Sequence, residues 1–474
     1  MTNRITLALL VGFTISACAA SEPSNDGSGG SSATGGVSGT GGAARGTGGA
    51  TSTGGVVGTG GATGTGGAIG TGGAKATGGI TGTGGTKATG GTTGTGGSTG
   101  TGGGKATGGT TGTGGSTSTG GATGTGGVTG TGGSSSASSS VHVVGNQIYD
   151  GTTALRLLGV NRPGGEYACV TQANTIWDPG DGSGNNAATI TLMQSWKVNA
   201  VRIPMNEDCW LSRNNTKTSG TTYQNAIKTW VNLLLQAGIY PILDLHWTEN
   251  NGALANGQQP MPDMANAPTF WSQVAAAYAD SPKVIFDLFN EPYPDNNMEA
   301  TAAWTCWKSG GTCTGINYPV AGMQTLVTAV RNAGANNLIV LGGIEYSNDL
   351  SQWMTYKPTD PANNLAVSWH VYPNSNYTSN HTLMMDAMGV AGMVPIVATE
   401  IGGALDGSCT ATSGTDNGSF ITMAMSYLDG LSPPQSYVAW SWSTDDTPVI
   451  ISNLNGTAAC SGITYKAHLL ATPH

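Results

Sequence analysis

Short apolar runs alternate with longer amphipathic stretches along residues 141–474. Each run is rich in valine, isoleucine and leucine, a composition typical of strands that are buried on both faces of a parallel sheet. Eight such runs predict strands, at residues 155–161, 200–205, 240–246, 284–290, 338–343, 365–372, 395–401 and 437–443.

The stretches between these runs predict helices, because their apolar residues recur at helical spacing. The clearest lie at residues 226–237, 270–279, 323–333 and 420–428. Strands that alternate with helices indicate an α/β fold, and eight such units in about 300 residues fit a closed (β/α)8 barrel, the TIM barrel. An open doubly wound sheet is the alternative, but no GxGxxG motif follows the first run.

Residues 21–140 have a different pattern, in which Thr-Gly-Gly and Thr-Gly-Thr-Gly-Gly units repeat without aromatic residues and with few charges. Such a segment has too little apolar surface to offset the conformational entropy of folding. A regular repeat can indicate a solenoid, but these units contain no apolar face that would stack. We therefore predict a disordered, flexible Gly/Thr/Ser-rich linker over residues 21–140. One large domain is expected to follow, over residues 141–474.

The first twenty residues are typical of a signal peptide. Arg4 precedes an apolar run at residues 5–15 that is too short to span a bilayer. Ile15-Ser16-Ala17-Cys18 resembles a bacterial lipobox, in which Cys18 would carry the lipid. The alternative is an ordinary secretory signal that is cleaved near Ala19 or Ala20. Either interpretation predicts an extracytoplasmic protein, as an outer-surface lipoprotein or a secreted one.

Charge and cysteine content narrow the choice of partners. The formal net charge is −9, and an acidic domain without a basic stripe repels phosphate backbones, which argues against nucleic acid. No CxxC or Cys/His cluster indicates a zinc site. Outside the cytoplasm the six cysteines other than Cys18 are expected to form disulfides. We predict the pairs Cys306–Cys313, Cys169–Cys209 and Cys409–Cys460.

Chemically active side chains are concentrated at the carboxyl ends of the predicted strands, which in a barrel face the active-site mouth. Carboxylates, imidazoles and indoles predominate there, and no metal-ligand spacing occurs, so we expect neither a metal nor another cofactor. Two carboxylates that face each other across such a mouth suit the hydrolysis of a sugar polymer. The residues at these ends are Asn161, Arg202, His246, Asn290, Glu291, Glu345, His370, Tyr372, Glu400, Trp440 and Trp442.

Among the carboxylates, Glu291 and Glu400 are the best catalytic candidates because each ends a strongly apolar strand. Pro292 fixes the turn after Glu291, and glycines after Glu400 leave room for close approach. We interpret Glu345 as a hydrogen-bonding acid of the rim. Asp244 and Asp287 lie within strands and are expected to make structural hydrogen bonds.

This set of residues resembles glycoside hydrolase family 5, the cellulase family, and Asn290-Glu291-Pro292 is its most specific element. The resemblance extends over about residues 144–470. It implies that Glu291 is the acid/base and Glu400 the nucleophile, with Arg202 supporting Glu400 and Tyr372 donating a hydrogen bond to it. It further implies that sugar is bound by Asn290, His246, His370 and Trp440, although Trp442 is an alternative to Trp440.

The resemblance implies a retaining, endo-acting β-glycanase that acts on β-1,4-glucan, and we expect a monomer. The same residues would also serve hydrolysis of mannan, xyloglucan or β-1,3-glucan. A catalytically silent surface protein that binds carbohydrate is the alternative from another class. We expect the charge of Glu400 to raise the pKa of Glu291. Tryptophans after strands, such as Trp210, Trp247, Trp304, Trp307 and Trp353, could stack on sugars, and segment 250–268 could wall one end of the groove.

Overall fold

A computed structural model describes residues 140–473 except 172–174, 179–183, 295–300, 374–388 and 404–417. Of the residues before 140 it describes the backbone of sixteen short strands between residues 32 and 125. The chain divides into two compact units, Met1–Ser136 and Ala137–His474, each of which is described by itself.

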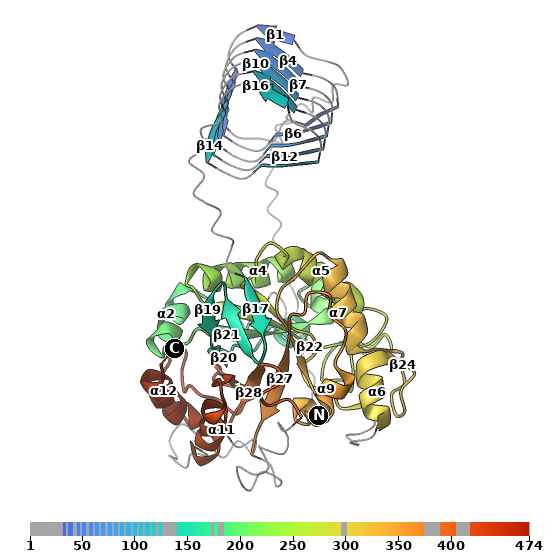
Figure 1. Ribbon diagram of the computed structural model, residues 1–474, viewed down its shortest axis with the longest axis vertical. Helices are drawn as coiled ribbons and strands as arrows, with labels where there is room; N and C mark the ends of the chain where they lie inside the picture. The colour runs from blue at the N-terminus through green and yellow to red at the C-terminus, as the bar shows by residue number, and fades with distance from the viewer. Residues whose placement is uncertain are drawn as a thin grey trace, which may run out of the picture. The chain divides into compact units, whose positions relative to one another are not determined.

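The second unit contains a closed parallel barrel of eight strands (Figure 1), as the alternation of apolar runs predicts. Every predicted strand is present in the expected order, so the TIM-barrel prediction is confirmed. Ladder bonds run around the whole circle, and β29 pairs with β20 to close it. The strands are β20 (Leu158–Asn161), β21 (Ala200–Asn206), β22 (Tyr240–Trp247), β23 (Ile285–Asp287), β26 (Ile339–Gly342), β27 (Leu365–Val371), β28 (Ile396–Ile401) and β29 (Ser436–Ala439).

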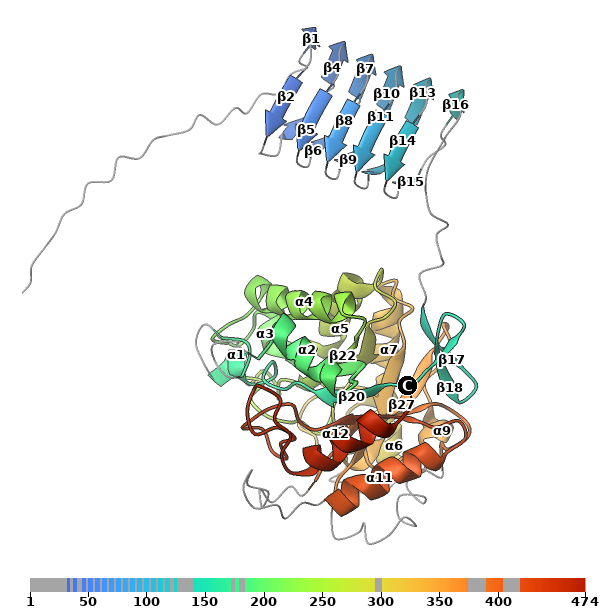
Figure 2. The same ribbon diagram turned by 90° about the vertical axis from the view of Figure 1, so that its left-hand side faces the viewer.

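Helices cover the outside of the barrel and bury their apolar faces against the strands (Figure 2). In α4, for example, Ile227, Trp230, Val231 and Leu234 are buried at helical spacing. The four predicted helices are present, and the longer helices are α2 (Ala187–Ser195), α4 (Thr221–Gln236), α5 (Ala267–Tyr278), α7 (Met323–Asn332), α11 (Gly418–Gly430) and α12 (Ser461–Ala471). No helix among the described residues is long and apolar enough to cross a membrane.

An antiparallel three-stranded sheet packs on the end of the barrel where the strands begin. It consists of β17 (Val141–Val144), β18 (Gln147–Asp150) and β19 (Thr153–Leu155). Val141 and Ile148 of this sheet join a separate apolar cluster with residues near the strand starts, such as Ala200, Ile242 and Ile285. Because this end is filled by apolar side chains, a functional site is expected at the opposite end.

Segments after the strands contain short elements and two disulfides. Cys169–Cys209 joins the segment after β20 to the one after β21, and Cys306–Cys313 closes a small loop, so both predicted pairs are confirmed. Cys409 of the third predicted pair lies outside the described residues. The short elements are α1 (Ala168–Thr171), α3 (Glu207–Leu211), α6 (Thr301–Ser309), β24 (Gly310–Gly311), β25 (Val320–Ala321), α8 (Ile344–Ser347) and α9 (Trp353–Tyr356).

The described strands of the first unit form three parallel sheets (Figure 2). The linker over residues 21–140 stays a prediction. Each strand pairs in register with the third strand after it, so that Thr86 lies opposite Gly104. In a sequence repeat, in-register pairing lets the backbone N–H and C=O groups of one unit bond those of the next without an apolar face.

Sixteen strands of the first unit belong to three sheets. The first sheet contains β1 (Ser32–Thr34), β4 (Ala50–Thr53), β7 (Ala68–Thr71), β10 (Thr86–Thr89), β13 (Gly104–Thr107) and β16 (Thr123–Thr125). The second contains β2 (Val37–Thr40), β5 (Val56–Thr59), β8 (Ala74–Thr77), β11 (Thr92–Thr95) and β14 (Thr110–Thr113). The third contains β3 (Arg45–Thr47), β6 (Ala62–Thr65), β9 (Ile80–Thr83), β12 (Ser98–Thr101) and β15 (Ser116–Thr119).

Candidate active site

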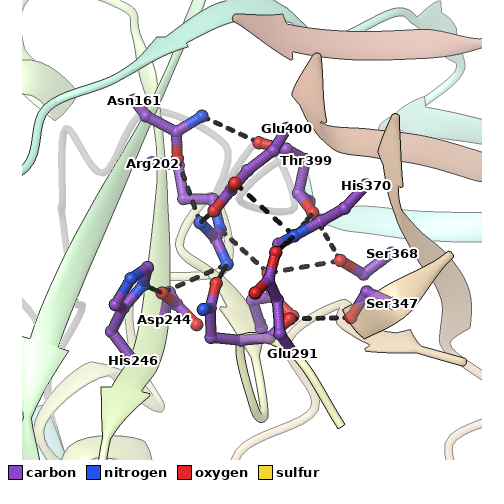
Figure 3. Close-up of polar contacts among 12 residues, drawn as sticks. Asn161, Arg202, Asp244, His246, Glu291, Ser347, Ser368, His370, Thr399 and Glu400 are labelled. Atoms are coloured by element: carbon purple, nitrogen blue, oxygen red, sulfur yellow. Dashed lines mark hydrogen bonds and ion pairs between the residues drawn. The ribbon is translucent and has the colours of Figure 1, made fainter. Parts of the chain in front are cut away.

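The carboxyl ends of the barrel strands bring the predicted polar residues together in one buried network (Figure 3). Because parallel strands all end at the same rim, side chains far apart in sequence become neighbours there. The network draws on six strands and the residues that follow them: Asn161 of β20, Arg202 of β21, His246 of β22, Asn290 and Glu291 after β23, His370 of β27 with Tyr372 after it, and Glu400 of β28.

Arg202 lies at the centre of the network and is completely buried. Its Nε donates to Asp287 Oδ2 at 2.9 Å, and its Nη2 lies 3.1 Å from Asp244 Oδ2. Nη1 donates to Glu400 Oε1 at 2.7 Å and to Asn161 Oδ1 at 3.1 Å. One guanidinium therefore contacts three carboxyl groups. Asp244 and Asp287 bond Arg202, as expected for residues with a structural role.

Glu400 is held from two sides. Arg202 Nη1 donates to its Oε1, and the Tyr372 hydroxyl donates to its Oε2 at 2.6 Å. The side chain is almost fully buried. Two donors, one on each oxygen, therefore fix the orientation of this carboxyl group.

Glu291 has a different environment, because its hydrogen-bond partners include no cation. His370 Nδ1 lies 2.8 Å from its Oε1, and Gln258 Nε2 donates to its Oε2 at 2.7 Å. Burial raises the pKa of the Glu291 carboxyl, while the hydrogen bond from Gln258 lowers it. The pKa is therefore raised as expected, but the main cause is burial rather than the charge of Glu400.

Both histidines line the site as neutral side chains. Burial lowers the pKa of His246 to about 4 and that of His370 to about 3. His246 Nδ1 lies 2.6 Å from Asp244 Oδ2, so the neutral ring donates from Nδ1 to that carboxylate. Its ring also stacks on Trp440, with centroids 5.6 Å apart and an interplanar angle of 16°. Together His246 and Trp440 form an aromatic wall at one side of the mouth.

The structure separates the two tryptophans that the sequence left as alternatives. Trp442 is fully buried and packs edge-on against Trp196 at 4.9 Å, so it belongs to the core. Trp440 stacks on His246 instead. Of the five tryptophans proposed to stack on sugars, only Trp247 is half-buried. The other four are buried in the core: Trp210, Trp304, Trp307 and Trp353.

Gln258 is a site residue that the sequence does not indicate. It lies in segment 250–268, which was expected only to wall the groove, and it reaches the carboxylate of Glu291. A long segment rich in Gly, Pro and Gln after the third barrel strand was the available signal, but spacing does not indicate which glutamine points inward. Glu345 is half-buried in the turn after β26.

One oxygen of Glu291, one oxygen of Glu400 and one nitrogen of His370 lie within 4.8 Å of one another. Such a group could surround a metal ion, but the same side chains already bond to protein partners: His370 to Glu291, and Glu400 to Arg202 and Tyr372. The arrangement provides two close carboxyl groups with different environments: Glu400 bonds Arg202 and Tyr372, whereas burial raises the pKa of Glu291. That is the pairing that general acid and nucleophile chemistry requires.

Comparison with known proteins gives a consistent result. Residues 161–446 match the family model described as Cellulase (glycosyl hydrolase family 5). The chain is 27% identical over 258 residues to endoglucanase EG-II of Hypocrea jecorina, a match that covers 48% of this chain and 55% of that protein. It is 24% identical over 326 residues to the manganese-dependent endoglucanase Eg5A of Phanerodontia chrysosporium, covering 63% and 75%. The chain thus spans about half the length of EG-II.

Among solved structures, a β-glucanase from Saccharophagus degradans has the same fold. It superposes with a TM-score of 0.54 at 21% identity, covering 70% of this chain and 92% of that one. A hyperthermophilic endocellulase from Pyrococcus horikoshii superposes with a TM-score of 0.52 at 18% identity, covering 70% and 98%. At these identities the likeness concerns the fold.

Proposed function

Since the chain belongs to the cellulase family, glycosyl hydrolase family 5, we propose that it is an endo-acting β-1,4-glucanase that hydrolyses its substrate with retention of anomeric configuration. Glu400 is the nucleophile and Glu291 the acid/base in this proposal. No metal or other cofactor takes part in the steps that it assigns.

The observation that carries the proposal is the pairing of Glu291 and Glu400. One oxygen of each lies within 4.8 Å of the other. Inverting glycosidases hold their carboxyl groups about 6.5–9.5 Å apart to admit a water molecule, whereas retaining ones hold them at about 5–5.5 Å. A short separation supports direct attack by Glu400 on the sugar, and the raised pKa of Glu291 supports its role as the proton donor.

The reaction would have two steps. In the first, a Glu400 oxygen bonds to the anomeric carbon, while the Glu291 proton moves to the departing glycosidic oxygen. In the second, Glu291 takes a proton from water, which attacks the same carbon and releases Glu400. Arg202 and Tyr372 hold Glu400 aligned before each turnover.

The remaining residues would bind the sugar at the bond that breaks. Arg202 Nη2 donates to Asn290 Oδ1 at 2.9 Å, which fixes the amide so that its amino group can donate to the sugar 2-hydroxyl. His246 and Trp440 provide an aromatic wall, and sugar rings present C–H faces that pack well on such surfaces. His370 orients Glu291 through its Nδ1 contact.

The choice of β-1,4-glucan is supported by the names of the relatives. EG-II and Eg5A are endoglucanases, and the Saccharophagus β-glucanase has been solved in complex with cellotetraose. We expect purified protein to lower the viscosity of carboxymethyl cellulose faster than it releases reducing ends, as an endo-acting enzyme does. Mannan, xyloglucan and β-1,3-glucan should be assayed beside it, with Glu400→Ala protein as the control.

Three other results of that assay would contradict the proposal in different ways. Faster hydrolysis of mannan, xyloglucan or β-1,3-glucan would leave the mechanism but change the substrate. Release of reducing ends without an early fall in viscosity would mean exo action. Binding to glucan without any hydrolysis would favour the silent carbohydrate-binding protein.

Gln258→Leu is expected to shift the pH dependence of hydrolysis. Gln258 donates to the ionised carboxylate and so lowers the pKa of Glu291; without that donor the pKa rises. Because the acid must be protonated in the first step, the basic limb of kcat/KM should move to higher pH. The profile of Gln259→Leu, whose side chain bonds Asn250 instead, is the matched control. A basic limb that stays in place or moves down would contradict the assignment.

We also propose that the protein acts outside the cytoplasm, as an outer-surface lipoprotein or a secreted enzyme. The apolar run at residues 5–15 and Cys18 support this location, and so do the disulfides Cys169–Cys209 and Cys306–Cys313, which persist in oxidising compartments. Its partner there is a polysaccharide, on which a monomer can act.

A further inference from the structure

Three consecutive polar residues at the end of β21 are completely buried, although the proposed reaction does not use them. Asn206 is the last residue of β21, and Glu207 and Asp208 begin α3. Burying a carboxyl group costs free energy unless the group finds polar partners. All three side chains find partners in segment 250–268, the segment after β22 that carries Gln258.

Asn206 and Asp208 hold both backbone polar groups of Ala255. The Ala255 N–H donates to Asp208 Oδ2 at 2.8 Å, and Asn206 Nδ2 donates to the Ala255 carbonyl oxygen at 2.8 Å. Ala255 itself is fully buried. Because these are the two obligatory hydrogen-bonding groups of the residue, its position is tied to the start of α3. Segment 250–268 is thus fastened three residues before Gln258.

Glu207 reaches the same segment at a second point, Asp263, five residues after Gln258. Burial raises the pKa of Glu207 well above its usual range, and the nearby Asp263 carboxyl raises it further. Among the described residues no donor reaches either oxygen of Glu207, so its protonated carboxyl serves as the donor to Asp263. The attachments at Ala255 and Asp263 therefore lie on either side of Gln258.

The helix that makes these contacts is itself fixed. Cys209 of α3 forms a disulfide with Cys169, and the Cys209 N–H donates to Asn206 Oδ1 at 3.1 Å, which caps the helix. Asn214 Nδ2 lies 3.1 Å and 3.0 Å from the two carboxyl oxygens of Asp208. A helix held by a disulfide, a cap and a side-chain amide provides a rigid support for the segment.

Gln258 connects this support to the proposed acid. Its Nε2 donates to Glu291 Oε2 at 2.7 Å, and this hydrogen bond lowers the pKa of Glu291. Because Gln258 has no charge, moving it alters that pKa and leaves the charges around Glu291 unchanged. The titratable and charged groups that face Glu291 are Arg202, Asp244, His246, Tyr293, His370, Tyr372 and Glu400.

We propose that Asn206, Glu207 and Asp208 are positioning residues, which hold segment 250–268 so that Gln258 stays within hydrogen-bond distance of Glu291. The proposal rests on the function proposed above, and it adds three residues that control the proton affinity of the acid from a distance. It also explains why α3 begins with two buried carboxyl groups. Release of the segment would withdraw Gln258, and Glu291 would then keep its proton to higher pH.

A double-mutant cycle of Asp208→Ala and Gln258→Leu tests this coupling, with the pH dependence of kcat/KM as the readout. Asp208→Ala removes the acceptor of the Ala255 N–H. The basic limb should then move to higher pH by roughly 0.5–1 unit, since a hydrogen bond to a charged group corresponds to about one unit or more. In Gln258→Leu protein the same substitution should move the limb no further. A direct charge effect has the opposite sign, because loss of a nearby anion lowers the pKa of a carboxyl group.

Three further variants separate the attachment from charge and from stability. Glu207→Gln keeps a donor toward Asp263 and should leave the basic limb in place, whereas Glu207→Leu has no donor and should move it to higher pH. Asp360→Ala is the matched control, because Asp360 is a buried aspartate before β27 that accepts the Asn364 N–H at 2.8 Å and pairs with Arg331. This variant should lower the melting temperature and leave the limb unmoved.

Hydrogen exchange of the full-length protein gives a readout that does not depend on activity. In Asp208→Ala the amides of segment 250–268 should exchange faster than in the native protein, while those of α4 should exchange as before. Faster exchange in both places would mean that the substitution only destabilises the whole domain. Unchanged exchange in segment 250–268 would mean that α3 does not hold it.

The kinetic results can overturn the proposal in two other ways. A basic limb that moves to lower pH in Asp208→Ala, or that moves equally with and without Gln258, would mean that Asp208 acts on Glu291 without the segment. An unmoved limb would mean that α3 does not position Gln258. If the native protein hydrolyses no glycan of the panel, the proposed function fails, and hydrogen exchange then decides by itself whether α3 holds the segment.

Discussion

Glu400→Ala is expected to abolish hydrolysis of every substrate, including those with good leaving groups. Its carboxylate accepts hydrogen bonds from Arg202 at 2.7 Å and from Tyr372 at 2.6 Å, and the proposed reaction has no other nucleophile. Loss of the nucleophile lowers kcat by roughly 10⁶-fold in a well-studied hydrolase. Initial rates on carboxymethyl cellulose and on cellobiosyl fluoride measure the loss. A melting curve checks that the variant is folded.

Glu291→Ala is the informative partner of that variant. A departing group that is already stable as an anion needs little help from an acid. This variant should therefore hydrolyse cellobiosyl fluoride much better than the polymer. Added azide should then give a glycosyl azide of retained configuration, because Glu400 remains to form the intermediate. Glu345→Gln, a carboxylate that also follows a barrel strand, should keep its activity within about tenfold if only two carboxylates do the chemistry.

Proton NMR of the first product decides the stereochemistry. A β-linked substrate should give the β-anomer first, since two displacements at one carbon restore its configuration. An initial α-anomer would mean that a water molecule attacks directly, and Glu400 could then no longer be the nucleophile. The separation of the carboxylates, within 4.8 Å at the nearest ligand atoms, makes the β-anomer the expected product.

The barrel and the polar residues of its mouth could be predicted from sequence because two simple patterns coincide. Strands buried on both faces appear as unbroken apolar runs, and the first polar residues after such runs must lie at one rim. Arg202, Glu291 and Glu400 were identified in this way, and the structure places them in one network. Their catalytic roles stay predictions.

What the sequence could not predict depends on loops and on burial. Gln258 lies in a long irregular segment without a period, so nothing in the spacing shows that it reaches Glu291. The turn after β26 contains three consecutive left-handed residues, Glu345, Tyr346 and Ser347, a conformation that these residue types do not indicate. Trp304 and Trp307 were expected to stack on sugars, but both are buried in the core. An indole that follows a strand can equally well complete the core.

The second large effect concerns stability, and it follows from Arg202. This guanidinium contacts Asp244, Asp287 and Glu400 in a fully buried setting. Removing one partner of a buried ionic group leaves charge without compensation, which destabilises a protein by about 3–5 kcal/mol. We expect Arg202→Met, which retains an unbranched apolar stem, to lose that much unfolding free energy near neutral pH. Urea unfolding followed by tryptophan fluorescence measures it.

The pH dependence of the loss distinguishes charge from packing. Burial raises the pKa of Asp244 to about 7 and that of Asp287 well above its usual value, and the charge of Arg202 partly counteracts both increases. In Arg202→Met these folded-state pKa values rise further above the unfolded ones, so the folded variant binds protons more tightly than the unfolded chain. Its stability is then greatest at acidic pH and falls as pH rises through those values. The difference from the native protein should accordingly be smaller at pH 5 than at pH 8.

Arg202→Lys tests the geometry separately from the charge. An ammonium group keeps the positive charge but lacks the planar fork that lets Arg202 bond Asp287 through Nε and Glu400 through Nη1. We expect Arg202→Lys to recover much of the stability at pH 8 and little of the activity, because Glu400 loses its alignment. If Arg202→Met lost the same free energy at both pH values, the side chain would act by filling space. The three carboxylates would then have to be protonated in the native protein.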